Sequence, residues 1–170
     1  MSSVHLENIN KSFGSINALS NLNLEIKDGE FFVLLGPTGA GKTTTLRIIS
    51  GLEMPDSGNI FFNEEKVNDV QPAFRDTSYV FQQYSLYPHY SVYDNLAFPL
   101  RSPLRKSDKK TIDDRVHQIA RLLKIESKLN NKATQLSGGE MQRVSLGRAL
   151  VREPNIYLMD EPLSSLDAKL

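Results

Sequence analysis

The chain has 170 residues, 39% of them hydrophobic and 24% charged, which is the composition of an ordinary globular domain with room for a core. Its formal net charge is zero, which argues against a broad nucleic-acid-binding surface, and it has no cysteine, which excludes disulfides, thiolate metal sites and a cysteine nucleophile. The first residues lack the basic start and apolar stretch of a signal peptide, and no apolar run approaches the roughly 20 residues of a membrane span. We therefore expect a soluble, intracellular protein that is able to dock on a membrane protein.

The first half of the chain is expected to alternate short strands with one helix. Leu22, Leu24 and Ile26 alternate with polar neighbours, as in a half-exposed strand. Residues 31–35 form a continuous apolar run, which is typical of a strand buried on both faces of a parallel sheet. The elements predicted in this half are strands at 22–26, 31–35, 60–62 and 77–81, and a helix that follows residues 36–43 and ends at 51–58.

The second half is expected to be mainly helical. Residues 84–103 are rich in aromatic residues and proline, which predicts a loop with a short helix. The clearest helix is predicted at 107–124, with Ser107 as its N-cap. Its apolar stripe consists of Ile112, Val116, Ile119, Ala120 and Leu123.

Two more elements follow, a helix at 141–151 and a buried strand at 156–159. The order of elements indicates an α/β protein with a helical stretch inserted between two strands. We expect one domain, in which residues 1–83 and 151–170 form the sheet-bearing core and residues 84–150 form the helical insertion.

The segment GPTGAGKT at residues 36–43 has the pattern G-x-x-x-x-G-K-[ST] of a phosphate-binding loop. Its glycines allow the backbone to wrap around a phosphate, and its N–H groups and the following helix N-terminus attract the anion. Lys42 is placed to reach the β- and γ-phosphate oxygens, and the Thr43 hydroxyl is placed to bind Mg²⁺.

Asp160 and Glu161 follow the last predicted strand, at the edge of an open α/β sheet where ligands bind. Next to a phosphate loop, Asp160 is expected to hold Mg²⁺ through water, and Glu161 to orient or deprotonate an attacking water. Gln82 ends the strand predicted at 77–81, and its amide is able to bind Mg²⁺ or the attacking water. Taken alone, Gln82 reads as an ordinary loop residue.

A second Gly-rich turn, Leu136-Ser137-Gly138-Gly139-Glu140, precedes the helix predicted at 141–151. A turn at a helix N-terminus presents free N–H groups to an anion. Two phosphate-facing turns in one small domain leave three possibilities open: one nucleotide, two nucleotides, or half of a shared site.

Together and in this order, the motifs resemble those of the nucleotide-binding subunits of ABC transporters, over nearly the whole chain. Residues 36–43 resemble the Walker A motif, 156–161 the Walker B motif with its catalytic glutamate, 136–140 the family signature and 164–167 the D-loop. The resemblance implies a P-loop NTPase (RecA-like) core sheet with an antiparallel β subdomain and an inserted α-helical subdomain that carries the signature.

The resemblance implies ATP and Mg²⁺ as cofactors. Phe13 takes the place of the aromatic residue that stacks on adenine, where tyrosine is commoner. The implied nucleotide-binding residues are Phe13, Gly36, Pro37, Thr38, Gly39, Ala40, Gly41, Lys42, Thr43, Thr44, Ser137, Gly138, Gly139 and Glu140. The implied catalytic residues are Glu161, Lys42 and Gln82, and the implied metal-binding residues are Thr43, Gln82 and Asp160.

The partners implied by the resemblance are a second ATPase subunit, identical or different, and transmembrane permease subunits. Two ATPase domains would pack head to tail, so that each ATP lies between the phosphate loop of one and the signature of the other. The chain is then expected to be cytoplasmic, on the inner face of the cell membrane. Tyr84, Tyr87 and Tyr90 are expected to line the groove that receives the permease, and transport should fail when Tyr84 and Tyr87 are replaced.

Residues 84–89 resemble the importers of sugars and related solutes, although polyamine, iron and anion importers carry similar runs. The family's switch histidine lies some thirty residues beyond the Walker B glutamate, whereas this sequence stops at Leu170. We expect a chain truncated at the C-terminus that hydrolyses ATP poorly by itself.

The sequence is also compatible with three other functions. A soluble ABC-type ATPase of DNA repair or translation shares both phosphate motifs. A P-loop kinase or GTPase would leave residues 136–140 unexplained, and a non-catalytic binding module would leave Glu161 unexplained.

Overall fold

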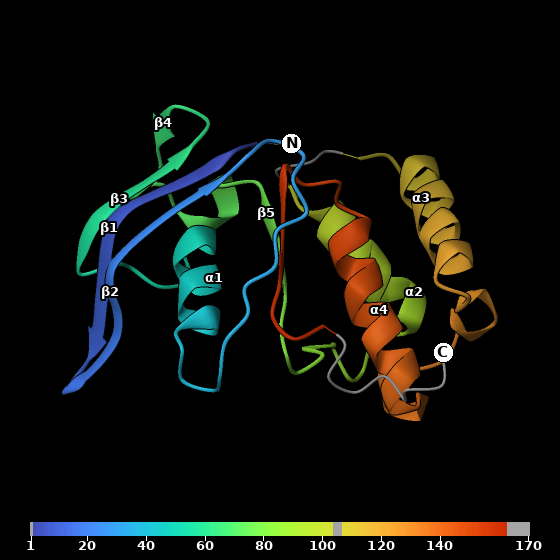
Figure 1. Ribbon diagram of the computed structural model, residues 1–170. Coiled ribbons are helices and arrows are strands. Elements are labelled where there is room, and N and C mark those ends of the chain that lie inside the picture. Colours follow the sequence, from blue (N-terminus) through green and yellow to red (C-terminus); the bar gives the residue numbers. More distant parts are fainter. Residues whose placement is uncertain (1, 104–106, 163–170) are drawn as a thin grey trace. The chain divides into compact units, whose positions relative to one another are not determined.

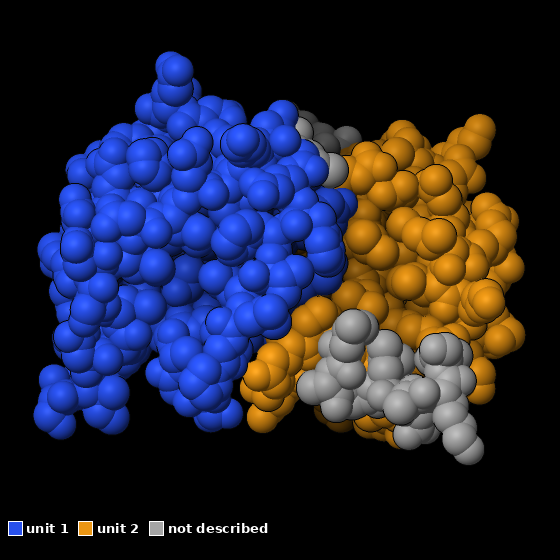
Figure 2. Space-filling model, viewed as in Figure 1, with its two compact units in different colours: residues 1–77, 154–160 blue, residues 78–153, 161–170 orange. Residues whose placement is uncertain are grey.

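A computed structural model describes residues 2–103 and 107–162 (Figure 1). The chain divides into two compact units (Figure 2). Unit 1 comprises residues 1–77 and 154–160, and unit 2 comprises residues 78–153 and 161–170. The strands are β1 (Val4–Phe13), β2 (Ile16–Ile26), β3 (Ser57–Phe62), β4 (Glu65–Lys66), β5 (Thr77–Val80) and β6 (Ile156–Met159). The α-helices are α1 (Lys42–Ser50), α2 (Val92–Ala97), α3 (Lys109–Leu122) and α4 (Gly138–Leu150), and short 3₁₀ turns lie at Pro72–Phe74, Phe98–Arg101, Glu126–Lys128 and Ala133–Gln135.

Unit 1 is built on an antiparallel sheet with the strand order β2-β1-β3-β4, and α1 lies beside it (Figure 1). Leu6 of β1 pairs with Leu24 of β2 and with Ile60 of β3, so that the alternating apolar residues share one face. Leu6 and Ile60 are completely buried, as is Ile48 of α1. The predicted antiparallel β subdomain and the strands predicted at 22–26 and 60–62 are therefore present.

The strand predicted at residues 31–35 is wrong. These residues form no regular element, and Phe31 and Leu35 are 91% and 89% exposed. A strand of a parallel sheet is buried because helices cover both faces of the sheet, and its backbone groups need at least one neighbouring strand as a hydrogen-bond partner. None of the strands in the described part of the chain pairs with this segment, and an apolar run by itself supplies no backbone partners.

The segments that lead into β5 and β6 lie side by side within unit 1, because the Asn155 backbone N–H donates a hydrogen bond of 3.0 Å to the Asp76 carbonyl. The strand predicted at 77–81 corresponds to β5, and the strand predicted at 156–159 to β6. β6 is less buried than predicted, since Leu158 is buried but Met159 is 37% exposed.

Unit 2 is helical. Its core contains the predicted stripe of α3, with Ile112, Val116, Ile119 and Ala120 buried, together with apolar residues of α2 and α4. Gly147 allows a close approach, because a Cβ atom at this position would lie 2.6 Å from Leu96 Cδ2.

The N-cap of α3 is Asp108, not Ser107 as predicted. The Asp108 carboxylate accepts hydrogen bonds from Thr111 N (2.9 Å) and Thr111 Oγ1 (2.7 Å). Serine and aspartate are equally good N-caps, so two consecutive candidates leave the first helical residue undetermined by sequence.

Candidate nucleotide-binding site

The phosphate loop at residues 36–43 leads directly into α1, as predicted. Gly41 is the N-cap of this helix and has a left-handed backbone, with φ of 81°. A Cβ atom at position 41 would lie 2.6 Å from Leu19 Cδ2 and 2.7 Å from the Ala18 carbonyl oxygen. Both the backbone conformation and the space therefore require glycine, which brings the start of α1 close to β2.

Lys42 is folded over its own loop. Its ammonium group donates hydrogen bonds to the carbonyl oxygens of Gly36 (2.8 Å) and Pro37 (2.9 Å). The side chain therefore places a positive charge inside the loop, at the helix N-terminus, where an anion is also favoured by the free N–H groups.

Thr43 and Asp160 lie together in unit 1, although 117 residues separate them in the sequence. The Thr43 hydroxyl donates a hydrogen bond of 2.9 Å to Asp160 Oδ1, and Asp160 is only 6% exposed at the end of β6. A hydroxyl and a carboxylate oxygen are the ligands that Mg²⁺ takes beside a phosphate loop.

The donor set around Thr43 and Asp160 fits a magnesium ion that is shared with a nucleotide. Across residues 2–103 and 107–162, no three or more histidine, aspartate or glutamate side chains form a group able to hold a metal. Mg²⁺ is usually held by one or two carboxylates together with the phosphates of a substrate, so a single carboxylate and a hydroxyl match that mode of binding.

Gln82 and Glu161 lie together in unit 2. The Gln82 amide donates a hydrogen bond of 2.7 Å to Glu161 Oε2, and both side chains are exposed. Glu161 has φ of 48°, the left-handed region that non-glycine residues rarely adopt. The structure thus pairs Gln82 with Glu161, a contact that the position of Gln82 in the sequence did not reveal.

The signature segment forms the start of α4, in unit 2. Ser137 is the N-cap, its backbone N–H donates to Glu140 Oε2 (2.8 Å), and Glu140 N donates to Ser137 Oγ (3.4 Å). Lys128 adds an ion pair of 3.1 Å to Glu140 Oε1. The hydrogen bond from the Ser137 backbone, supported by Lys128, lowers the pKa of the Glu140 carboxyl.

The helix predicted at 141–151 therefore begins earlier, and Gly138 and Gly139 belong to its first turn, not to a preceding loop. The spacing of Ser137 and Glu140 is that of a capping box, the sequence signal that marks this start.

Phe13 ends β1 in unit 1, and the residue is 47% exposed. The ammonium group of Lys11 lies 5.1 Å from the ring centroid. Sequence reasoning missed Lys11, because a lysine in a strand with alternating polarity is indistinguishable from a solvated surface residue.

The aromatic segment after Gln82 forms a cluster within unit 2. The ring centroid of Tyr87 lies 5.3 Å from that of Tyr90 and 4.6 Å from that of Phe98. Tyr90 and Phe98 are 41% and 42% exposed. The guanidinium of Arg148 lies 4.5 Å from the Tyr87 ring centroid and donates to the Ser85 carbonyl, which joins this segment to α4.

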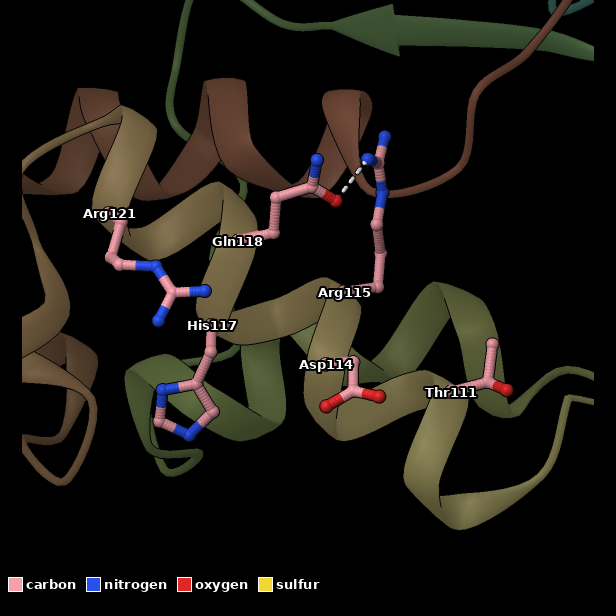
Figure 3. A pocket seen from close by; sticks show the side chains of 6 residues that line it. All are labelled: Thr111, Asp114, Arg115, His117, Gln118 and Arg121. Carbon is pink, nitrogen blue, oxygen red and sulfur yellow. Dashed lines mark hydrogen bonds between the residues drawn. The ribbon is translucent and has the colours of Figure 1, made fainter.

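The surface of α3 carries a shallow hollow (Figure 3). All of its lining residues lie between positions 111 and 121, a range that contains no predicted nucleotide-binding residue. Its lining residues are Thr111, Asp114, Arg115, His117, Gln118 and Arg121. Its arginines already have partners, since Arg115 pairs with Glu153 (2.7 Å) and Arg121 with Glu126 (3.7 Å). None of the predicted site residues lines this hollow.

Two further expectations concern the rest of the chain. The D-loop predicted at 164–167 lies outside the described residues. Among the helices that the structure describes, none has the length and apolar character needed to cross a membrane.

Comparison with known proteins identifies the family. The ABC transporter family model matches residues 19–164, which include the phosphate loop, Asp160, Glu161 and the signature but not Phe13. The chain is 53% identical to the trehalose/maltose import ATP-binding protein MalK of Thermococcus litoralis, over all of this chain and 47% of that protein. It is 47% identical to the spermidine/putrescine import ATP-binding protein PotA of Fusobacterium nucleatum, over 98% of this chain and 44% of that protein.

The chain thus spans about half the length of the curated relatives that it matches. A solved dimeric structure of a post-hydrolysis ATP-binding cassette bound to ADP and phosphate is similar in fold, with a TM-score of 0.86 and 35% identity. That similarity covers 98% of this chain and 77% of the other, and it confirms the predicted fold class. The chain belongs to the ABC transporter family.

Proposed function

We propose that this chain is the ATP-binding part of a subunit that hydrolyses ATP to power the import of a solute. The observation that carries this proposal is the pairing of Thr43 with Asp160 beside the phosphate loop. A P-loop threonine next to a carboxylate at a strand end is the arrangement that holds Mg²⁺ against nucleotide phosphates. The family membership and the import proteins among the relatives support the same function.

In this proposal the loop binds the phosphates, and Thr43, Asp160 and Gln82 hold Mg²⁺. ATP would supply the phosphoryl group, and Mg²⁺ held there would help to neutralise the negative charge on its oxygens. Lys42 adds a positive charge from within the loop, which stabilises the same negative charge. Glu161 accepts the proton of an attacking water, and the Gln82 amide orients its carboxylate.

The signature is proposed to act on the nucleotide of a second subunit. Ser137 and the N–H groups of Gly138 and Gly139 stand at the N-terminus of α4, where an anion is favoured. The similar cassette that binds ADP and phosphate is dimeric, which supports a head-to-tail dimer of this chain or of its parent with another ATPase subunit. The two Gly-rich turns left open one nucleotide, two nucleotides or half of a shared site. We propose the last of these.

The proposed partners are transmembrane permease subunits, and the proposed location is the inner face of the cell membrane. The exposed rings of Tyr90 and Phe98 support a contact with such a partner. One relative is named for trehalose and maltose and another for spermidine and putrescine, so we propose import of a sugar or related solute. Both are import proteins, which gives no support to a role in DNA repair or translation, and the zero net charge suits a protein that binds no nucleic acid.

ATP titration of the chain, with and without Mg²⁺, tests the proposed site. We expect Lys42→Ala to weaken ATP binding by at least about tenfold, and Asp160→Asn to remove most of the gain that Mg²⁺ provides. Lys66→Ala, which removes a lysine from β4, serves as the control and should bind ATP normally. Unchanged affinity in both site variants would contradict the proposal.

The shared site has a separate test in the ATP-dependent association of the parent subunit. We expect Ser137→Ala to abolish the dimer while ATP binding by the monomer survives. If the Ser137→Ala variant dimerised as well as the wild type, the proposal that the signature binds the nucleotide of a second subunit would be contradicted.

A further inference from the structure

Lys11 is engaged by three oxygen atoms in unit 1. Its ammonium group lies 2.8 Å from Glu53 Oε1, 3.4 Å from Asp56 Oδ1 and 2.8 Å from the Met54 carbonyl oxygen. The side chain is only 12% exposed. The hydrogen bond with Glu53 raises the pKa of Lys11 against the opposing effect of burial, so the group remains charged at neutral pH.

The same ammonium group lies over Phe13. Its distance of 5.1 Å from the ring centroid falls within the range of a cation–π contact. Phe13 nevertheless retains 47% of its surface exposed. The lysine therefore restrains the ring from one side and leaves surface available for another flat group.

The residues that hold Lys11 also hold the end of α1. Glu53 N donates to the carbonyl of Arg47 in the last turn of that helix (3.2 Å). Asp56 Oδ2 accepts a hydrogen bond from Ser12 N (2.7 Å), and Asp56 N donates to the Asn10 carbonyl (2.8 Å). The segment after α1 is thereby fastened to the end of β1 on both sides of Lys11.

These contacts form a continuous path through unit 1. α1 begins at the phosphate loop, ends at the segment that binds Lys11, and through Lys11 reaches the ring of Phe13. One helix and one largely enclosed ammonium group thus connect the phosphate loop to the ring.

We propose that Lys11 is a positioning residue for the nucleotide base, which holds the Phe13 ring at a fixed place relative to the phosphate loop so that the ring stacks on the base. This inference rests on the proposed function, and on the base-stacking role that the family resemblance implies for Phe13. Lys11 is not proposed to contact the phosphates, so its effect should be confined to ligands that carry a base.

A purely structural role makes a different prediction. If Lys11 only fastened β1 to the segment after α1, its loss would lower the affinity for every ligand of the site by the same factor. Inorganic tripolyphosphate has the phosphates of ATP but no base, so the two ligands separate the roles.

The experiment compares the affinities of ATP and inorganic tripolyphosphate, both with Mg²⁺, for the chain and its variants. We expect Lys11→Met to weaken ATP binding about two- to fivefold, the size of an exposed cation–π contact, and to leave tripolyphosphate binding unchanged. Lys11→Arg keeps the cation and should restore ATP affinity to within about twofold. Phe13→Leu should weaken ATP binding about tenfold. In a chain that already carries Phe13→Leu, Lys11→Met should not weaken ATP binding further.

Arg101→Met is the matched control. Arg101 also combines an ion pair, 2.9 Å to Asp94, with a ring contact, 6.0 Å to the Tyr93 centroid, but it belongs to unit 2. The Arg101→Met variant should bind ATP and tripolyphosphate with the affinities of the wild type. If Lys11→Met unfolds the chain, Glu53→Gln provides a second variant, because it frees the ammonium group from its nearest carboxylate and should also weaken ATP binding alone.

Three results would overturn the inference. Equal losses for ATP and tripolyphosphate would show that Lys11 is a structural fastener. If Phe13→Leu weakened ATP binding tenfold and Lys11→Met did not weaken it, the stacking role of Phe13 would stand but Lys11 would have no part in it. Normal ATP binding by Phe13→Leu would refute the stacking role itself, and with it this inference, while the Lys42 and Asp160 variants would still test the proposed function.

Discussion

Arg75 holds the C-terminus of the helix that begins at the phosphate loop, and replacing it with methionine should lower the free energy of unfolding of the chain. The guanidinium is buried and donates four hydrogen bonds to carbonyl oxygens: Ile48 (2.9 Å), Ile49 (3.0 Å), Val70 (2.9 Å) and Asn68 (3.1 Å). Burial lowers the pKa of Arg75. The side chain therefore satisfies carbonyls that the helix end leaves without intrahelical partners.

The four bonds do not contribute equally to the loss. The Ile48 carbonyl also accepts from Gly51 N (3.1 Å), so it keeps a partner, whereas the Ile49 carbonyl loses its guanidinium bond in a buried position. An unsatisfied buried carbonyl costs about 1–3 kcal/mol. The bonds to Val70 and Asn68 are only partly buried, so water can replace much of their contribution. Methionine keeps the apolar stem and no longer buries a charge, so we expect a net loss of about 2–3 kcal/mol.

Urea unfolding followed by circular dichroism measures this loss. With a slope of about 1–3 kcal/mol per molar urea, the midpoint should fall by about 1 M. Arg47→Met is the control, because Arg47 is an exposed cation in the last turn of the same helix and its interaction with the helix dipole is worth less than about 1 kcal/mol. Equal stabilities of the Arg75 and Arg47 variants would refute the assignment of Arg75 as a structural cap.

Two further predictions concern the phosphate loop and the signature segment. Gly41→Ala should destabilise the chain by roughly 2–4 kcal/mol in the same urea assay, because the left-handed backbone resists a side chain and the new Cβ would meet Leu19; a loss below about 0.5 kcal/mol would contradict it. Glu140→Gln should cost about 0.5 kcal/mol at pH 7, since it removes the charge that Lys128 and the helix N-terminus attract. Because the folded pKa of Glu140 lies below its ordinary value of 4.5, this contribution is present above that value and disappears as the pH falls through the folded pKa. A difference between wild type and variant that grew in acid would refute this reading.

The parts of the site that could be predicted from sequence are those in which local chemistry determines local structure. The phosphate loop is recognisable because its glycines and Lys42 are consecutive and lie directly before a helix. The pairing of Thr43 with Asp160 was foreseeable in kind, since both follow from motif chemistry. Its geometry was not, because 117 residues separate the two and only the folded chain brings them within hydrogen-bonding distance.

The errors arise where the deciding contact is distant or where neighbouring residues compete. Residues 31–35 are apolar enough for a buried strand, but a strand also requires partners, and composition does not provide them. The N-cap of α3 is Asp108 and not its neighbour Ser107. N-cap propensities do not decide between two adjacent candidates. Lys11 gave no signal in the sequence, because its two carboxylate partners lie more than forty residues away in the chain.

Glu161 offers a test of whether backbone strain is stored where the chemistry is proposed. Its φ of 48° costs a residue with a side chain about 1–2 kcal/mol and costs glycine almost nothing. Glu161→Ala and Glu161→Gly both remove the carboxylate that Gln82 binds, so they differ only in backbone freedom. At an ordinary position the glycine variant would be the less stable by about 0.5–1 kcal/mol. Here we expect the glycine variant to be the more stable by about 0.5–1 kcal/mol in urea unfolding, because relief of the strain outweighs the gain in unfolded-state entropy. If the alanine variant were instead the more stable by about 0.5–1 kcal/mol, as at an ordinary position, Glu161 would be unstrained. If the glycine variant is the more stable, the chain keeps a glutamate at a stability cost, as expected for a residue that is retained for its carboxylate.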